Sequence, residues 1–153
     1  MITELKPRPE LHANAKLQAL YLQLDSIVRE LNKRDLPEEM QGYISSELEE
    51  INSIIDNEQV LKKLIRKKQG EILARLEKDL KLVTKNHYRN TWLALGIAVF
   101  GVPLGVVFGT AMGNMAFLGI GLPIGLPIGL AIGTGMDKKA ADEGRQLDVE
   151  IRF

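Results

Sequence analysis

The sequence predicts an all-α protein in which a long cytoplasmic helical hairpin or coiled coil is joined to a transmembrane hairpin of two helices. Two observations support this class. Apolar residues recur at spacings of three and four through the charged first 90 residues, as on one face of a helix. Residues 91 to 136 then contain no Asp, Glu, Lys or Arg, and this run is more than twice the roughly 20 residues that cross a bilayer.

The overall composition conceals this division. The 153 residues are 45% hydrophobic and 26% charged, with a mean hydropathy of -0.05, which is typical of a soluble domain. The mixed charges of the first 16 residues do not fit a signal peptide, so the first membrane helix is expected to act as its own insertion signal. The chain has no cysteine, which excludes disulfides, thiol catalysis and thiolate metal sites.

The first predicted helix covers residues 9 to 34. Its apolar residues form a narrow stripe of the kind found in the seam of a coiled coil or a helical hairpin: Ala13, Leu17, Leu20, Leu24, Ile27 and Leu31. The stripe offers more apolar seam than one monomeric hairpin would need. We therefore expect the chain to self-associate, as a homo-oligomer.

The second predicted helix starts near Asp35, which we expect to be its N-cap, with Glu38 three residues on. A second apolar stripe follows, made of Met40, Ile44, Leu48, Ile51 and Ile55. The sequence from Asp56 to Gln59 is a weaker start signal, so the helix either breaks there or runs through. The pattern resumes with Leu61, Ile65, Ile72, Leu76, Leu80 and Val83, and Lys68 occupies a seam position. Residues 1 to 90 thus form two or three helices, the last of which leads into the membrane.

The membrane region, residues 91 to 136, is expected to turn at Gly113 and Asn114, the only strongly turn-forming pair within it. This division gives crossings at about 92 to 112 and 115 to 135. A single helix of the full length would overshoot the bilayer twofold. Residues 137 to 153 form the remaining cytoplasmic tail.

Glycine recurs at every fourth position of each crossing. We expect both runs to give glycine-zipper packing, because glycines let helix backbones approach closely in lipid. Either the two runs face each other within one monomer, or one packs within the monomer and the other between neighbours in a ring. The runs consist of Gly101, Gly105, Gly109 and Gly113, and of Gly121, Gly125, Gly129 and Gly133.

Two prolines interrupt the second crossing. Pro123 and Pro127 lack N–H donors, so the carbonyls of Gly119 and Pro123 are expected to lose their helical partners. An unsatisfied carbonyl in hydrocarbon is costly unless protein or water satisfies it. The prolines therefore mark either a central aqueous path or a plain kink repaired locally.

The charges predict the orientation in the membrane. Residues 59 to 91 contain 10 basic and 3 acidic residues, which places this side in the cytoplasm, and two crossings return the tail to the same side. The basic block is either a solvated helix face or a surface for anionic lipid headgroups, and nucleic acid is disfavoured because the chain as a whole is not basic. The residues expected at the headgroups are Lys81, Lys85, Tyr88, Arg89, Trp92, Lys138 and Lys139.

Enzyme activity is not expected. His12 and His87 are the only histidines, and the membrane run has no charge, so the spacing supports neither a catalytic triad nor a metal cluster nor a proton relay. No cofactor is expected either, because no glycine-rich loop follows a strand and ends in Lys-Ser or Lys-Thr.

The tail ends in QLDVEIRF, where Leu147, Val149, Ile151 and Phe153 alternate with charged residues. Strict alternation is typical of a strand, and a single strand needs a partner. The tail is therefore either disordered, paired with a neighbour's tail, or paired with the sheet edge of a different protein.

The glycine runs, together with IGTGMDKKAADEGRQL, resemble small bacterial glycine-zipper membrane proteins over about residues 101 to 147. The resemblance implies an inner-membrane protein that oligomerises through its glycines. Two functions follow as hypotheses. The first is a homo-oligomeric pore or channel, gated or positioned by its cytoplasmic helices. The second is a non-conducting anchor or scaffold that recruits a cytoplasmic protein partner through the helical region or the tail.

Overall fold

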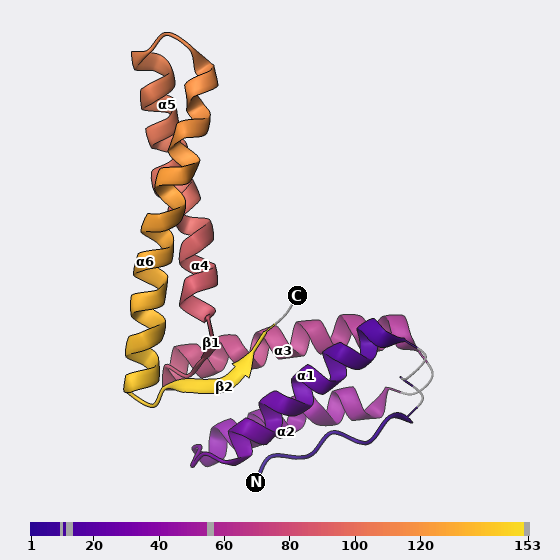
Figure 1. Ribbon diagram of the computed structural model, residues 1–153. Coiled ribbons are helices and arrows are strands. Elements are labelled where there is room, and N and C mark those ends of the chain that lie inside the picture. The colour runs from indigo at the N-terminus through magenta and orange to yellow at the C-terminus, as the bar shows by residue number, and fades with distance from the viewer. Residues whose placement is uncertain (10, 12–13, 55–56, 152–153) are drawn as a thin grey trace. The chain divides into compact units, whose positions relative to one another are not determined.

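The computed structural model describes residues 1–9, 11, 14–54 and 57–151, and it is mostly helical (Figure 1). The predicted all-α class is confirmed. The chain divides into two compact units, of which the first comprises residues 1–83 and 147–153 and the second comprises residues 84–146. We describe each unit by itself.

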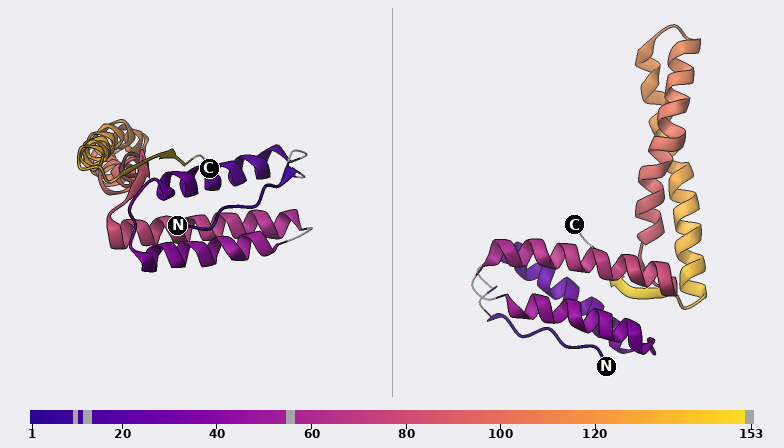
Figure 2. Two further views of the ribbon diagram at one scale, coloured as in Figure 1. Left: turned by 90° about the horizontal axis from the view of Figure 1, so that it is seen from below. Right: turned by 180° about the vertical axis from the view of Figure 1, so that it is seen from behind.

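Three helices build the first unit: α1 (Ala15–Asn32), α2 (Glu38–Ser53) and α3 (Glu58–Leu80), which lie side by side in both views of Figure 2. Leu17, Leu24 and Leu31 on α1 are fully buried against apolar side chains of α2 and α3. The seam that predicted self-association is therefore covered within one chain. Of the stripe residues, Ala13 and Ile55 lie outside the described residues.

The helix starts differ from those predicted. α1 begins at Ala15 because the side chain of Asn14 accepts a hydrogen bond from the N–H of Leu17 and so caps the helix. The prediction that Asp35 caps the second helix is wrong: α2 is preceded by Pro37, whose side chain makes no capping bond. The break that the sequence left open is present, since Asn57 caps α3 by accepting from the N–H of Val60. Asp56 lies outside the described residues.

The first eight residues form an extended segment that packs against α1 and α2. Ile2 and Leu5 belong to the apolar core of the unit. Polar side chains satisfy the backbone of the segment: Asn32 accepts from Ile2 N, Ser45 accepts from Thr3 N, and Asn52 bonds both Lys6 N and Glu4 O. These side-chain hydrogen bonds take the place of the backbone hydrogen bonds that a neighbouring strand would supply, so the extended segment is stable against helices.

One ion cluster lies at the buried seam between α2 and α3. Lys68 Nζ lies 2.5 Å from a carboxylate oxygen of Glu47 and 2.5 Å from one of Glu50. Hydrogen bonds to the two carboxylates raise the pKa of Lys68 above its usual value, against the opposing effect of burial. The lysine predicted on the apolar seam is thus stabilised by two acidic residues of the neighbouring helix.

The second unit contains two long helical segments joined by a short turn. The first runs through α4 (His87–Leu95), a π-helix η2 (Gly96–Gly101) and α5 (Val102–Ala111). The second runs through a 3-10 helix η3 (Met115–Ile120) and α6 (Gly121–Asp142). The turn lies at the predicted pair, and Gly113 adopts a φ of 65°, which favours glycine. We call residues 87–142 the helix pair.

Two short strands flank the helix pair, one before α4 and one after α6. The prediction that the third helix leads directly into the membrane is wrong, because α3 ends at Leu80 with Lys81 in the left-handed conformation, and β1 (Val83–Lys85) follows. The tail forms a strand, β2 (Gln146–Glu150), as its alternation indicates, but it pairs with β1 of the same chain, which is not among the predicted alternatives of disorder, a neighbour's tail or a different protein. Leu147 is fully buried in the core of the first unit. Phe153 lies outside the described residues.

Candidate membrane-spanning helix pair

The two segments of the helix pair are long and apolar enough to cross a membrane. They span His87–Ala111 and Met115–Asp142, and the most apolar 18 residues of each have mean hydropathies of 2.1 and 2.0. Both are longer than the predicted crossings, 92 to 112 and 115 to 135, because the helices continue into polar residues at the end opposite the turn. Only 22% and 17% of their most apolar windows are buried, unlike a helix in the core of a soluble protein.

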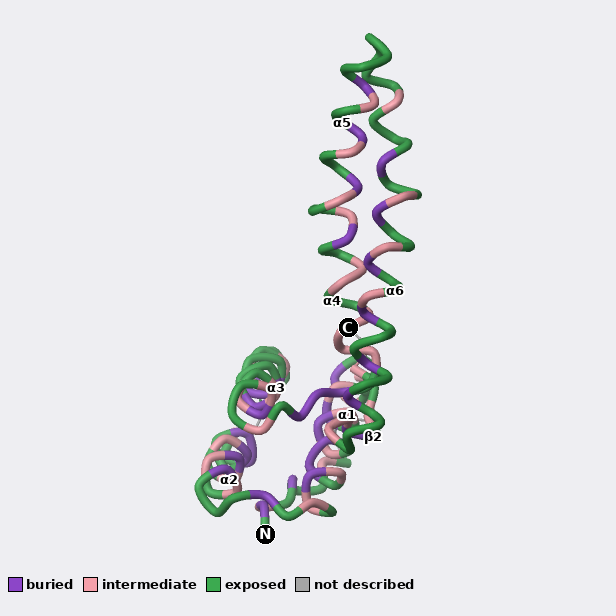
Figure 3. Tube along the Cα trace, turned by 90° about the vertical axis from the view of Figure 1, so that its left-hand side faces the viewer, coloured by how far each residue is buried: buried purple, intermediate pink, exposed green. Residues whose placement is uncertain are grey.

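Nearly every buried residue of the helix pair is a glycine. Between residues 87 and 142, all of which the structure describes, the other buried residues are Asp137 and Ala140. The buried glycines form two stripes, one on each segment, and Figure 3 shows the buried positions recurring along both. The α4–α5 stripe consists of Gly96, Gly101, Gly105 and Gly109, and the α6 stripe consists of Gly121, Gly125, Gly129 and Gly133.

The two stripes face each other within one chain. A Cβ atom added to Gly96 would lie 2.5 Å from the carbonyl oxygen of Gly125 and 2.7 Å from Cα of Gly129. A Cβ added to Gly125 would lie 2.7 Å from Cα of Gly101. Because Cβ atoms do not approach backbone atoms this closely, any larger residue at these positions would separate the helices. The contact is therefore made by backbone on both sides.

A π turn brings Gly96 onto the α4–α5 stripe. Gly96 and Gly101 are five residues apart, and in a regular α-helix they would lie about 140° apart around the axis. The N–H of Val102 instead bonds the carbonyl of Ile97, five residues back, so this turn holds an extra residue. The wide turn directly precedes Pro103, whose ring would otherwise collide with the carbonyl of Val99. A search for glycines four residues apart misses Gly96, because it lies five residues before Gly101.

Gly113 and Gly119 do not belong to either stripe. Gly113, which is predicted to take part in the glycine packing, does not pack between the two helices of one chain: it is exposed in the turn, and a Cβ added to it would meet nothing within 4 Å. The same holds for Gly119 in η3. The two glycines are thus exposed, whereas the stripe glycines contact the other helix, although all of them lie in one apolar sequence.

The two prolines of α6 differ in their effect on the backbone. Pro123 is the third residue of α6, in the first turn, where backbone N–H groups have no partner within the helix. Pro123 therefore removes no hydrogen bond from within α6, and the predicted loss of a helical partner for the carbonyl of Gly119 does not apply to this helix. Pro127 lies inside α6, so it leaves the carbonyl of Pro123 without its usual donor. The helix nevertheless runs unbroken from Gly121 to Asp142.

Asp137 closes the end of the pair opposite the turn. It follows the α6 stripe by one more interval of four, is buried, and accepts hydrogen bonds from Tyr88 N at 3.0 Å and from Arg89 N at 2.9 Å. These N–H groups belong to the first turn of α4, whose N-cap residue, Asn86, makes no capping hydrogen bond with its side chain. A carboxylate of one helix thus caps the other, where the helix dipole favours negative charge. Sequence analysis missed this residue, although the continued spacing indicates it.

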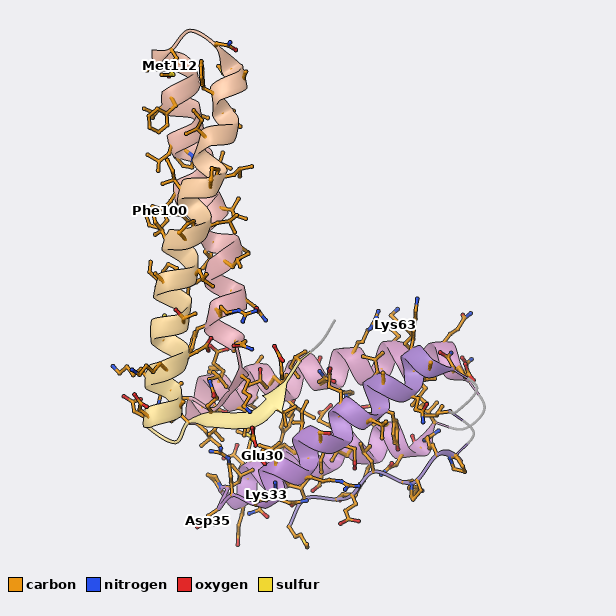
Figure 4. All side chains as sticks on the ribbon, viewed as in Figure 1. Glu30, Lys33, Asp35, Lys63, Phe100 and Met112 are labelled. Atoms are coloured by element: carbon orange, nitrogen blue, oxygen red, sulfur yellow. The ribbon has the colours of Figure 1, made fainter. Side chains whose placement is uncertain are left out.

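Large apolar side chains cover the outside of the helix pair. In Figure 4 they point outward along its length, Phe100 and Met112 among them. Val107 and Leu126 are 59% and 36% exposed. The hydroxyls of Thr110 and Thr134 bond backbone carbonyls of their own helices, so they present no hydroxyl hydrogen to the surroundings. From residue 92 to residue 136 the outer surface is thus largely apolar, and Asn114 in the turn is the main exception.

The residues expected at the headgroups lie in different settings. Tyr88, Arg89 and Trp92 begin the first segment, and Lys138 and Lys139 end the second, at the same end of the pair. Tyr88 and Arg89 also contact the α6 stripe, since a Cβ added to Gly133 would lie 2.6 Å from Cα of Arg89. Lys81 follows α3 in the first unit, and Lys85 ends β1.

Among the described residues, no group of three or more His, Cys, Asp and Glu side chains is placed to hold a metal ion. His12 lies outside these residues. The chain matches no protein-family model, no curated protein and no solved structure.

Proposed function

We propose that this protein is a membrane anchor that holds a folded helical domain at the cytoplasmic surface of the bacterial inner membrane. The helix pair spans the membrane twice as a hairpin, and the first unit is the domain that it holds. One observation carries the proposal: the pair is buried along its glycines and apolar on its outside. In water this arrangement would expose a large apolar surface, whereas in lipid that surface is solvated and close backbone packing replaces the hydrophobic effect.

The glycine contacts favour the anchor over a pore. A ring of hairpins needs one stripe for its neighbours, but both stripes face each other within one chain. The outside of the pair carries no charged side chain from residue 91 to residue 136 with which to line an aqueous path. Homo-oligomerisation and conduction stay predictions from the sequence, and the non-conducting anchor is the function that the geometry supports best.

The ends of the helix pair support a cytoplasmic location for both termini. Arg89, Lys138 and Lys139 lie at the end opposite the turn, where the basic residues of a cytoplasmic flank belong. Tyr88 and Trp92 lie at the same end and suit a headgroup layer, because their rings are apolar and their edges polar. Reporter fusions at the two termini should both be cytoplasmic, and a translocated terminus would contradict the hairpin.

Membrane integration is the direct test of the anchor. The full chain should resist extraction of bacterial membranes with alkaline carbonate. A double variant with Val106→Asp and Leu126→Asp places two charges on the outside of the pair and should become extractable, because each charge at mid-membrane costs about 3 kcal/mol. The matched control, Leu22→Asp with Val60→Asp, changes two exposed apolar residues of the first unit and should stay integrated. Extraction of the unaltered chain would overturn the proposal.

Conduction separates the anchor from the pore. Purified protein inserted into planar bilayers should stay silent over many insertions, because the anchor provides no polar path. Discrete conductance steps would instead support the homo-oligomeric pore.

The domain held by the anchor is expected to bind a protein partner. Deleting residues 146–153 is a poor test of a tail contact, because it would remove the buried Leu147 from the core. Charge reversals at the exposed Lys16 and Glu49 leave the core intact. Capture of a defined cytoplasmic partner that either reversal abolishes would support recruitment through the first unit.

A further inference from the structure

We propose that the N-terminal half of α3 is a second membrane contact, a basic surface for anionic lipid headgroups. The inference rests on the proposed membrane anchor and adds to it a role for the first unit. We call this surface the basic patch, and it consists of Lys62, Lys63, Arg66 and Lys67.

The patch is separated from the acidic residues of the unit. Residues 59 to 70 contain five basic residues and no acidic one. The fifth of these, Lys68, points into the unit and is held by Glu47 and Glu50. The side chain of Glu58, which precedes the patch, accepts a hydrogen bond from Asn14. Glu58 is therefore engaged with Asn14, and Glu71, which follows the patch, is the one other acidic residue of α3 within four positions of the patch.

The four basic side chains of the patch are available. Among the described residues, Lys62, Lys63 and Arg66 make no ion pair or hydrogen bond. Lys67 lies 3.9 Å from Glu71, an exposed pair that contributes little. Figure 4 shows Lys63 extending from α3 away from α1 and α2. Val60, 47% exposed beside the lysines, adds an apolar contact of the kind that accompanies basic residues at lipid surfaces.

Chain connectivity favours lipid over another acidic partner. Residues 81 to 86 are all that separate α3 from α4, the first helix of the proposed membrane hairpin, and they extend at most about 20 Å. A headgroup layer is thus within reach of α3 in every molecule that is anchored. An anionic layer attracts each nearby Lys or Arg, and the attraction falls off within a Debye length. Lys67, the patch residue nearest to this linker, lies about 20 Å along α3 from Leu80, so the anchor keeps headgroups at a high local concentration near the patch.

A single label can report the contact, because the chain has no cysteine. Gly70 is exposed, one helical turn beyond Arg66 and Lys67, and a Cβ added there would meet nothing within 4 Å. Gly70→Cys thus carries a fluorophore beside the patch without changing its charge. The labelled full chain is reconstituted into phosphatidylcholine vesicles, with or without a third of phosphatidylglycerol, that contain a quencher attached to headgroups.

We expect phosphatidylglycerol to at least double the quenching, and salt near 1 M to abolish the increase, since the Debye length is then about 3 Å. Changing Lys62, Lys63 and Arg66 to Gln should lower the equilibrium constant for contact by about a hundredfold. The matched control changes Lys16, Arg29 and Lys33 of α1 to Gln, which removes the same charge from another exposed helix and should preserve the quenching.

The outcomes separate this inference from the anchor. Equal quenching in both kinds of vesicle, with the protein still resistant to carbonate, overturns the headgroup surface and leaves the anchor standing. The same result is expected if the patch binds an acidic protein or nucleic acid. Extraction of the labelled protein by carbonate overturns the anchor, and the headgroup surface with it.

Discussion

The two units of the chain bury opposite kinds of residue. In the first unit the fully buried positions are large side chains such as Leu24, Ile44 and Leu76. In the helix pair the buried positions are glycines, and large side chains such as Val107 and Leu126 are exposed. A similar spacing of three or four residues therefore has opposite meanings in the two units. In the first unit it places large side chains in the packed interface, and in the helix pair it places glycine backbone there.

The proposed anchor explains this difference, because it places the first unit in water and the helix pair in lipid. In water, burying a Leu side chain removes it from solvent and contributes about 1.5–3 kcal/mol. In lipid, the surroundings are as apolar as the side chain, so burial gains little and helices associate by close packing. A helix whose glycines face its partner brings the two backbones together and leaves every large side chain to the acyl chains. Hydropathy averaged over the whole chain conceals both arrangements.

A leucine on the glycine stripe should have the largest effect. Gly125→Leu pushes a side chain into the backbone of Gly96 and Gly101, and we expect it to cost about 3 kcal/mol or more, at or beyond the usual range for overpacking. The stability of the hairpin can be measured in mixed micelles by titration with sodium dodecyl sulfate. Gly119→Leu is the control, because its side chain would meet open space.

The mass of the complex in detergent distinguishes contacts within a chain from contacts between chains. Changing both Gly125 and Gly129 to Leu should leave the mass unchanged, because the α6 stripe packs inside the hairpin. A shift to smaller mass would place the stripe between neighbouring chains, as the ring model requires.

Matched leucine truncations sharpen the contrast between the units. Leu24→Ala removes a fully buried side chain of the first unit and should lower the free energy of unfolding by about 2–5 kcal/mol. Leu126→Ala removes an exposed side chain that faces lipid in the proposed anchor, and it should change the stability of the hairpin by less than about 0.5 kcal/mol. Denaturation followed by a probe in each unit measures both effects. Equal costs would mean that the two units pack by the same rule.

The ion cluster of the first unit offers a smaller effect. Lys68→Met leaves Glu47 and Glu50 without their cation and should destabilise the unit by about 2 kcal/mol, whereas Lys67→Met at the surface should have little effect. The folded state raises the pKa of Lys68, so its contribution is complete below the pKa of the unfolded lysine, about 10.4. The contribution is lost as the pH rises through the higher folded pKa. A difference between the chain and the variant that already declines between pH 6 and pH 9 would contradict this account.

The cap at Asp137 should show the smallest effect. Asp137→Asn keeps one acceptor for the N–H groups of Tyr88 and Arg89 but removes the charge, so we expect a loss of about 1 kcal/mol. Faster hydrogen exchange at these two amides would report it, with the turn at Gly113 unchanged. Unchanged exchange at both amides would show that another group caps α4.

Much of the fold was predictable from local pattern. The lack of charge marked the apolar segments, Gly113 and Asn114 marked the turn between them, and the alternating tail marked β2. Each of these features depends on residues close in sequence. The same is true of the break before α3, which the sequence left open and which Asn57 resolves by capping the helix.

The features that the sequence did not predict depend on distant contacts. The extended first eight residues are held by side chains such as Asn52, 46 residues from its partner Lys6. Asp137 caps a helix 48 residues away, and Gly96 joins its stripe only through a π turn. The strand partner of the tail, β1, is too short to show alternation. The apolar stripe of α1 does not support the predicted coiled-coil association, because α2 and α3 cover it, and self-association stays a prediction.

The distance across the helix pair in lipid tests the account most directly. Spin labels at Val99 and Leu122, introduced as cysteines into the cysteine-free chain, report this distance by pulsed electron resonance. With labelled chains diluted into unlabelled ones in bilayers, we expect one short distance that persists at every dilution and widens in Gly125→Leu but not in Gly119→Leu. A short distance that disappears on dilution, or that Gly125→Leu leaves unchanged, would show that the glycines do not join the two helices of one chain.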